Sequence, residues 1–164
     1  MEKISFNSKE HKLFYEEMLG KFTYQDEYHK AFFYCMGSCE TTRKHINKLF
    51  DFDQGGINPD NINESFQTGT SYKVTRMAFN LWNGYVDENN PGAFTPNELF
   101  CCDLAKEFQQ AIKLRYPDNF MEREKGKDSI REKIEVLQKK QEHSKDTLEI
   151  KIEKRNELVN GGMR

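Results

Sequence analysis

Four cysteines fall in two close pairs, and helix packing could bring their thiols together. Cys35 and Cys39 are one helical turn apart, and Cys101 and Cys102 are adjacent. With a histidine as a further ligand, such a group could hold zinc, which takes four ligands in tetrahedral geometry. The spacing is not the two-residue gap of a zinc knuckle, however, and free cysteines are common on buried helix faces. We therefore predict no metal and no cofactor. If a metal did bind, its ligands would be these four cysteines.

An enzyme needs a nucleophile or a carboxylate pair held beside a base. Glu16, Glu17, His29 and Glu40 are candidate acid–base groups, but no spacing links them into one unit. Solvated charges and one partly buried histidine account for these residues. We therefore predict no catalytic residues and a protein that acts by binding.

The segment that begins at Gly69 carries the residues best suited to bind an anion. Gly69, Thr70 and Ser71 lead into a helix that contains Lys73 and Arg76. Free amides at a helix N-terminus, together with nearby cations, can hold phosphate. No Gly-Lys-Ser/Thr follows a glycine-rich loop, so the segment is not a P-loop. Capping of the helix by Ser71 is the simpler interpretation.

The same stretch also fits a helix-turn-helix motif, with a short helix over 59–66, a turn at Gly69 and a second helix over 71–83. The side chains that this second helix would turn outward are Tyr72, Lys73, Thr75, Arg76 and Asn80. Any two helices joined by a glycine turn give this pattern, and the net charge of −2 does not favour coating of nucleic acid. A DNA-binding regulator that uses Ser71, Lys73 and Arg76 is the alternative hypothesis.

Helical periodicity in the first 120 residues predicts an all-α body of five or six helices with no strand. We expect Asn7 to cap the first helix. A second helix from about Asp26 is apolar nearly all round, so it should be the central helix of the body. It should break at Gly37-Ser38. A third helix should then run to Phe50, followed by a loop over 51–56.

The clearest apolar stripe runs from Val74 to Tyr85 at the helical period. It predicts a helix capped by Ser71 and ended by Gly84, with Trp82 buried against the central helix. Thr95-Pro96-Asn97-Glu98 has the spacing of a capping box, so we expect one further helix from there to Tyr116. Its buried residues should be Leu99, Cys101, Leu104, Phe108 and Ile112.

The chain changes character after Phe120. Every aromatic residue and all four prolines lie at or before that position, whereas residues 121–160 contain ten acidic and eleven basic residues. A packed core needs large apolar side chains, so the core must come from the first part. We predict two parts: a compact multi-helix body over 1–120 and a long charged C-terminal helix over 121–164.

Apolar residues recur at heptad spacing in this second part: Ile130, Ile134, Leu137, Leu148 and Leu158. Gln141 and Ser144 interrupt the seam, which predicts a short or irregular coiled coil. Dimers are the commonest oligomers, so we expect the seam to form a homodimer.

Composition also bears on location. The chain has no run of about 18 apolar residues, so we expect no membrane span. Its first residues lack the apolar stretch of a signal peptide. We therefore expect a cytoplasmic protein, and in that reducing compartment the four cysteines should be thiols rather than disulfides.

Three stretches of the body resemble an uncharacterised family of small proteins from phages and mobile elements of Firmicutes. They are residues 45–50 (HINKLF), residues 67–71 running on to 79–85 (QTGTS and FNLWNGY), and residues 94–100 (FTPNELF). The resemblance covers roughly Phe6 to Pro117 and implies a host-directed or element-maintenance role. It supplies no catalytic residues. We therefore expect a non-enzymatic protein-binding module, an inhibitor or adaptor that acts on a host defence protein.

Overall fold

The computed structural model describes residues 4–120 and 133–139. The chain divides into two units, Met1–Phe120 and Met121–Arg164, and each is considered by itself. The first unit is a compact, mostly helical body, as the periodicity predicts. Among the described residues, no helix is both long enough and apolar enough to span a membrane.

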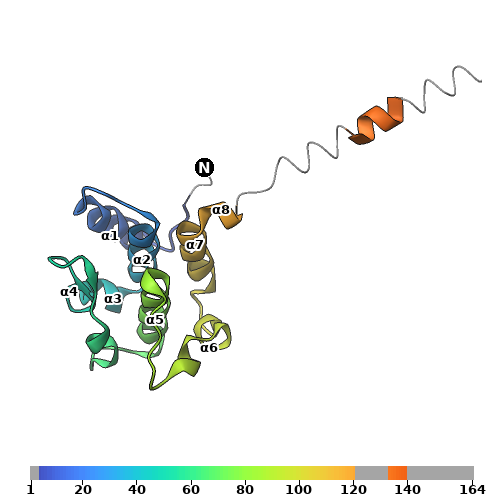
Figure 1. The fold of residues 1–164 in the computed structure, drawn as a ribbon. Helices are drawn as coiled ribbons and strands as arrows, with labels where there is room; N and C mark the ends of the chain where they lie inside the picture. Colours follow the sequence, from blue (N-terminus) through green and yellow to red (C-terminus); the bar gives the residue numbers. More distant parts are fainter. Residues whose placement is uncertain (1–3, 121–132, 140–164) are drawn as a thin grey trace, which may run out of the picture. The chain divides into compact units, whose positions relative to one another are not determined.

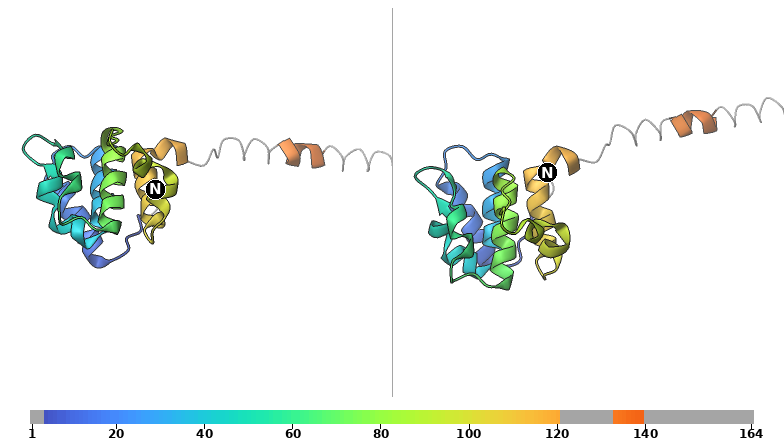
Figure 2. Two further views of the ribbon diagram at one scale, coloured as in Figure 1. Left: turned by 90° about the horizontal axis from the view of Figure 1, so that it is seen from below. Right: turned by 60° about the horizontal axis from the view of Figure 1, so that its bottom comes forward.

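The body has two central helices, α2 and α5, with the other elements around them. In chain order the elements are α1 (Lys9–Gly20), α2 (Glu27–Gly37), α3 (Glu40–Lys44), α4 (Ile46–Leu49), β1 (Phe50–Asp51), β2 (Gly56–Ile57), the 3-10 helix η1 (Pro59–Asn63), α5 (Gly69–Asn83), the 3-10 helix η2 (Pro91–Phe94), α6 (Pro96–Phe100), α7 (Ala105–Arg115) and α8 (Pro117–Phe120). Helices α1, α5 and α7 all pack on α2 (Figure 1). In all views, α4 and α7 lie on opposite sides of the α2–α5 pair (Figure 2).

Helix α2 is the centre of the core, as its apolar sequence predicts. All residues from Ala31 to Gly37 are buried. The rings of Phe32 and Phe33 each lie 5.1 Å from the ring of Phe50, which follows α4. A helix that is apolar all round is stable only when other elements cover every side, and α1, α5 and α7 provide that cover.

The buried C-terminal end of α2 needs hydrogen-bond donors from elsewhere. The last four carbonyl groups of a helix have no partner within it, and leaving them unpaired in a core is costly. Each of these four carbonyls in α2 accepts a side-chain hydrogen bond. The pairs are His11 Nε2 to the Tyr34 oxygen (2.7 Å), Ser38 Oγ to the Cys35 oxygen (2.7 Å), Thr42 Oγ1 to the Met36 oxygen (2.5 Å) and Arg43 Nη1 to the Gly37 oxygen (2.6 Å). This end of α2 therefore fixes α1 and α3 in place.

His11 and Gly37 set the distance between α1 and α2. His11 has no exposed surface, and its Nε2 carries a proton, because the Tyr34 carbonyl 2.7 Å away can only accept. Its Nδ1 lies 3.0 Å from Oδ1 and 3.4 Å from the backbone nitrogen of Asn7. A Cβ atom at Gly37 would lie 2.7 Å from Cδ2 of His11. Only glycine leaves room for this imidazole ring at the end of α2.

The N-cap of α5 lies three residues before the predicted position. Thr68, rather than Ser71, is the N-cap, and the helix begins at Gly69. Thr68 Oγ1 accepts the Ser71 N–H at 3.4 Å, and Ser71 Oγ accepts the Thr68 N–H at 2.6 Å, which forms a reciprocal capping box. Gly84 ends the helix with φ of 78°, the left-handed conformation that the sequence predicts.

The first helix also starts one residue later than predicted. Ser8 is its N-cap, because the side-chain amide of Asn7 donates instead to the Ser38 carbonyl at 2.8 Å. The expected loop over 51–56 includes one residue of each strand of a short antiparallel hairpin. Strands β1 and β2 have two residues each and pair Phe50 with Ile57 and Asp51 with Gly56. The prediction of no strand is therefore wrong at this point.

The expected single helix from Pro96 to Tyr116 is interrupted. It consists of α6 and α7, and the carbonyl of Cys101 between them accepts a hydrogen bond from Lys73 Nζ. Leu99 and Phe108 are buried as predicted, whereas Cys101 is exposed. Thr95 precedes α6 without a side-chain capping bond, so the predicted capping box does not form.

The hydroxyl of Thr42 tests the account of the α2 end. Thr42→Val keeps the side-chain shape but leaves the buried Met36 carbonyl without its donor, so we expect a loss of about 1–3 kcal/mol in the free energy of unfolding. Thr41→Val is the matched control, because it makes the same change on the same helix without removing a hydrogen bond seen in the described residues; we expect a change within about 0.5 kcal/mol. Urea unfolding measures both. Equal losses would contradict the account.

His11 predicts a pH dependence of stability. Burial lowers its pKa from the ordinary value of 6.5 to about 4. Between these values the unfolded chain binds a proton that the folded chain does not. The contribution of His11 to the free energy of unfolding is therefore complete above pH 6.5. It is lost as the pH falls towards 4, and the total loss is about 3 kcal/mol. His11→Gln can still donate to the Tyr34 carbonyl but does not titrate. Unfolding between pH 4 and 7 should show a shallower slope for this variant than for the natural chain, and identical slopes would refute the assignment.

Candidate functional site

The three residues predicted to bind an anion or DNA do not form one open site. Ser71 has no exposed surface, and its hydroxyl belongs to the capping box of α5. Lys73 Nζ donates to the Cys101 carbonyl. The guanidinium group of Arg76 lies 5.0 Å from the ring centre of Tyr72. Each group is thus engaged within the body.

The helix-turn-helix interpretation finds limited surface on α5. The first helix of the motif is the 3-10 helix η1. Every residue from Ser71 to Trp82 on the second helix is buried or half-buried. Thr75, expected to face outward, is fully buried and accepts a hydrogen bond from Gln67 Nε2 at 3.0 Å. That expectation is wrong, because the position packs into the core. A recognition helix must present one face to a groove, and α5 presents little.

The cysteines are free thiols in different surroundings. Cys35 is fully buried, and its Sγ donates to the Val74 carbonyl at 3.6 Å. Burial raises the pKa of its thiol, which disfavours the thiolate that metals bind. Cys39 and Cys102 are half-buried and Cys101 is exposed. Over residues 4–120 and 133–139, no group of three or more His, Cys, Asp or Glu side chains is placed to hold a metal ion.

Two residues of the predicted oligomerisation seam lie in the described part of the second unit. Residues 133–139 are helical, and Ile134 and Leu137 are exposed. Lys139 and Glu135 form an ion pair of 3.1 Å on this helix. The other three seam residues, Ile130, Leu148 and Leu158, lie outside the described residues.

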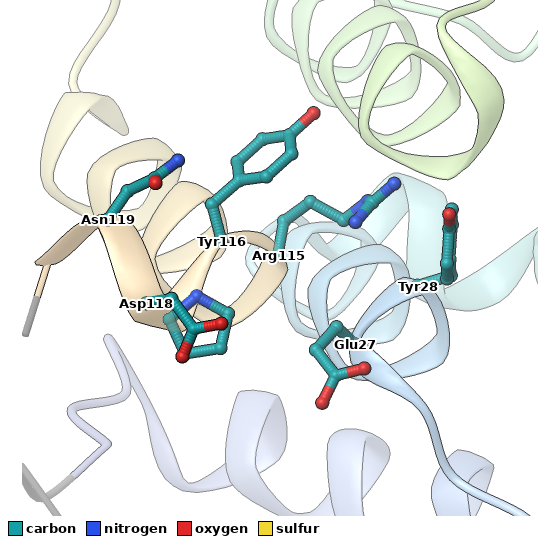
Figure 3. A pocket seen from close by; sticks show the side chains of 7 residues that line it. Glu27, Tyr28, Arg115, Tyr116, Asp118 and Asn119 are labelled. Atoms are coloured by element: carbon teal, nitrogen blue, oxygen red, sulfur yellow. The ribbon is translucent and has the colours of Figure 1, made fainter.

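A pocket of about 540 Å³ opens on the body where the end of α7 meets the start of α2 (Figure 3). Its lining combines aromatic, charged and amide side chains: Glu27, Tyr28, Arg115, Tyr116, Pro117, Asp118 and Asn119. Sequence analysis singles out none of these residues as a site.

Helix ends place these residues around the pocket. Asp26 caps α2, because its Oδ1 accepts the backbone N–H of His29 at 3.0 Å and lies 2.7 Å from Nδ1 of the same residue. Burial raises the pKa of Asp26, but the hydrogen bonds from His29 outweigh it and hold the pKa below its ordinary value. Glu27 and Tyr28 therefore start α2 at the surface. At the other wall, Pro117 cannot continue α7, and the turn of α8 brings in Asp118.

Arg115 is fixed on three sides. Its Nε donates to the Leu81 carbonyl at 2.8 Å, near the end of α5. Its guanidinium carbon lies 3.6 Å from the ring centre of Tyr28 and 4.8 Å from that of Tyr116. Figure 3 shows the guanidinium group extended towards Tyr28. We call Tyr28, Arg115 and Tyr116 the arginine clamp.

Aromatic contacts connect the arginine clamp to the core. Trp82 lies edge-on to Tyr28 at 6.4 Å and to Phe32 at 5.5 Å between ring centres. The predicted contact of Trp82 with the central helix at Phe32 is thus confirmed, but Trp82 is only half-buried. Tyr28 and Tyr116 are 41% and 42% exposed. A continuous aromatic cluster therefore reaches from the core to the rim of the pocket.

The composition of this surface suits binding. Tyrosine, tryptophan and arginine contribute most of the energy at protein–protein interfaces, because they combine large apolar area with directed polar groups. Glu27 and Asp118 add two carboxylates that form no ion pair with any residue in the described part of the chain. Little in the sequence marks these residues as a binding site, because Tyr28 lies on an apolar helix face and Tyr116-Pro117 marks a helix end.

Comparison with protein families finds a match for the chain. The model of DUF6075, a family of unknown function, matches residues 1–128, which include the whole body and its pocket. Neither the curated proteins nor the solved structures contain a significant match. The resemblance to an uncharacterised family is therefore confirmed at that level. The chain belongs to DUF6075, a family of unknown function.

Proposed function

We propose that this protein is a non-enzymatic protein-binding module and that the arginine clamp is the centre of its binding surface. The observation that supports the proposal is Arg115 held between two half-exposed tyrosines at the rim of a pocket. Nothing in this arrangement places a nucleophile beside a base, but each component is a preferred interface residue.

The rigidity of the clamp favours tight binding. Ordering a long side chain at an interface costs about 0.5–1.5 kcal/mol, and Arg115 already has this order from its bond to the Leu81 carbonyl. Trp82 packs edge-on against Tyr28. A partner therefore meets a surface that changes little on binding.

The family resemblance extends the proposal to a partner. The protein comes from a phage or mobile element of Firmicutes, acts in the cytoplasm of the host, and works as an inhibitor or adaptor on a host defence protein. The exposed position of the clamp is compatible with blocking such a protein by surface contact. DNA binding through Ser71, Lys73 and Arg76 is the alternative, with less support because α5 is largely covered.

The second unit forms a homodimer in this proposal. Ile134 and Leu137 lie exposed on the helix over 133–139, together with Val136. A second copy of this helix would cover these apolar side chains, and dimers are the commonest oligomers. The seam of Ile130, Ile134, Leu137, Leu148 and Leu158 would supply the contact.

Capture of host proteins tests the clamp. We expect full-length protein fixed to a support to retain a specific partner from host lysate, and Tyr116→Ala to retain about tenfold less of it, as for an interface hot spot. Tyr24→Ala is the matched control, because Tyr24 is 76% exposed but does not line the pocket. Its retention should equal that of the natural chain. No retention above a blank support, or equal retention by all three proteins, would show the proposal to be wrong.

Truncation tests the second unit. Light scattering should show a dimer for the full chain and a monomer for a chain that ends at Phe120, because the apolar seam is removed. Circular dichroism should show that the shorter chain keeps its helices. A monomeric full chain would disprove self-association, and unfolding of the shorter chain would show that the body depends on residues beyond Phe120.

A further inference from the structure

We propose that the arginine clamp recognises one carboxylate of its partner, carried by a peptide segment whose neighbouring residues are basic or neutral. This inference rests on the proposed function and names the chemistry that the clamp selects. It concerns the terminal nitrogens of Arg115 and the two carboxylates across the pocket (Figure 3).

Arg115 has the free donors that a carboxylate needs. A guanidinium group carries five N–H donors in a plane, and the one on Nε is bonded to the Leu81 carbonyl. Its two terminal nitrogens have no hydrogen bond or ion pair to any described residue. Two parallel N–H groups match the two oxygens of a carboxylate, which gives a bidentate bond of defined direction.

The Tyr28 ring limits the directions from which a ligand can reach this donor pair. The guanidinium carbon of Arg115 lies 3.6 Å from the centre of that ring, so the side of the group that Tyr28 covers is closed to a ligand. The aromatic contact leaves the positive charge in place while it removes water from the face. A desolvated, oriented cation favours an anion with fixed geometry.

Glu27 and Asp118 restrict which anion can bind. Both line the same pocket as Arg115, so the lining carries two negative charges and one positive charge. A polyanion such as a nucleic acid would bring several phosphates near these carboxylates, and the phosphates and carboxylates would repel each other because both are negatively charged. One carboxylate can meet Arg115 alone, and cationic neighbours in the same peptide would be attracted to Glu27 and Asp118.

A peptide titration of the isotope-labelled full chain tests this selectivity by NMR. The probes are end-blocked Lys-Glu-Lys, end-blocked Lys-Gln-Lys and inorganic phosphate, and the signals are the indole N–H of Trp82 and the side-chain amide of Asn119. We expect saturable shifts with Lys-Glu-Lys in the millimolar range, at least about tenfold weaker binding of Lys-Gln-Lys, and weaker binding of phosphate.

Arg115→Lys is the decisive variant, because it keeps the charge but loses the planar pair of donors. We expect at least about tenfold weaker binding of Lys-Glu-Lys to this variant. An amide spectrum that matches the natural chain shows that the variant is folded. Tyr24→Lys serves as a control that adds a surface cation away from the pocket and should leave peptide binding unchanged.

In the titration, the inference would be overturned by no saturable shift up to about 20 mM peptide, by equal binding of the Glu and Gln peptides, or by tighter binding of phosphate. The host-lysate capture separates this inference from the proposed function. If Tyr116→Ala loses the partner while Arg115→Lys keeps it, the clamp binds protein but not through a carboxylate. If both variants keep the partner, the binding surface lies elsewhere.

Discussion

The buried C-terminal end of α2 is the constraint on which the body depends. Its four terminal carbonyls lie in an apolar interior, where an unpaired acceptor costs about 1–3 kcal/mol. His11, Thr42 and Arg43 supply donors from α1 and α3, and Ser38 supplies one from the residue after α2. Helix α3 has five residues and buries only Thr42, so hydrogen bonding fixes its position. Helix α1 in addition packs Phe14, Tyr15, Met18 and Leu19 into the core. Gly37 permits the close approach that the His11 bond requires.

The opposite end of α2 carries the candidate site. With the helix held at one end, the Asp26 cap at the other presents Tyr28 to the end of α7. Arg115, the last residue of α7, bonds to a carbonyl at the end of α5. The start of α2 and the end of α7 thus meet at one pocket, and the end of α5 holds its arginine. Exposed side chains at these helix ends give the surface its polar character, whereas the sides of the same helices form the core.

Sequence periodicity predicts the all-α class, the central position of α2 and the left-handed Gly84, because these depend on neighbours within one or two turns. It does not predict the donors to the α2 carbonyls. His11 and Tyr34 are 23 residues apart, and nothing local marks a histidine that pairs with a distant backbone oxygen. The arginine clamp is missed for the same reason. Tyr28 and Arg115 come from separate helices, so only the packed body brings them together.

Hydrogen exchange of the full chain, free and in complex with the partner it captures, tests the binding surface most directly. Amides covered by a partner exchange more slowly, and a footprint locates the contact without any substitution. The account predicts added protection at residues 27–30 and 113–120, and unchanged exchange at residues 59–76. Protection confined to 59–76, with none at the two clamp segments, would contradict it.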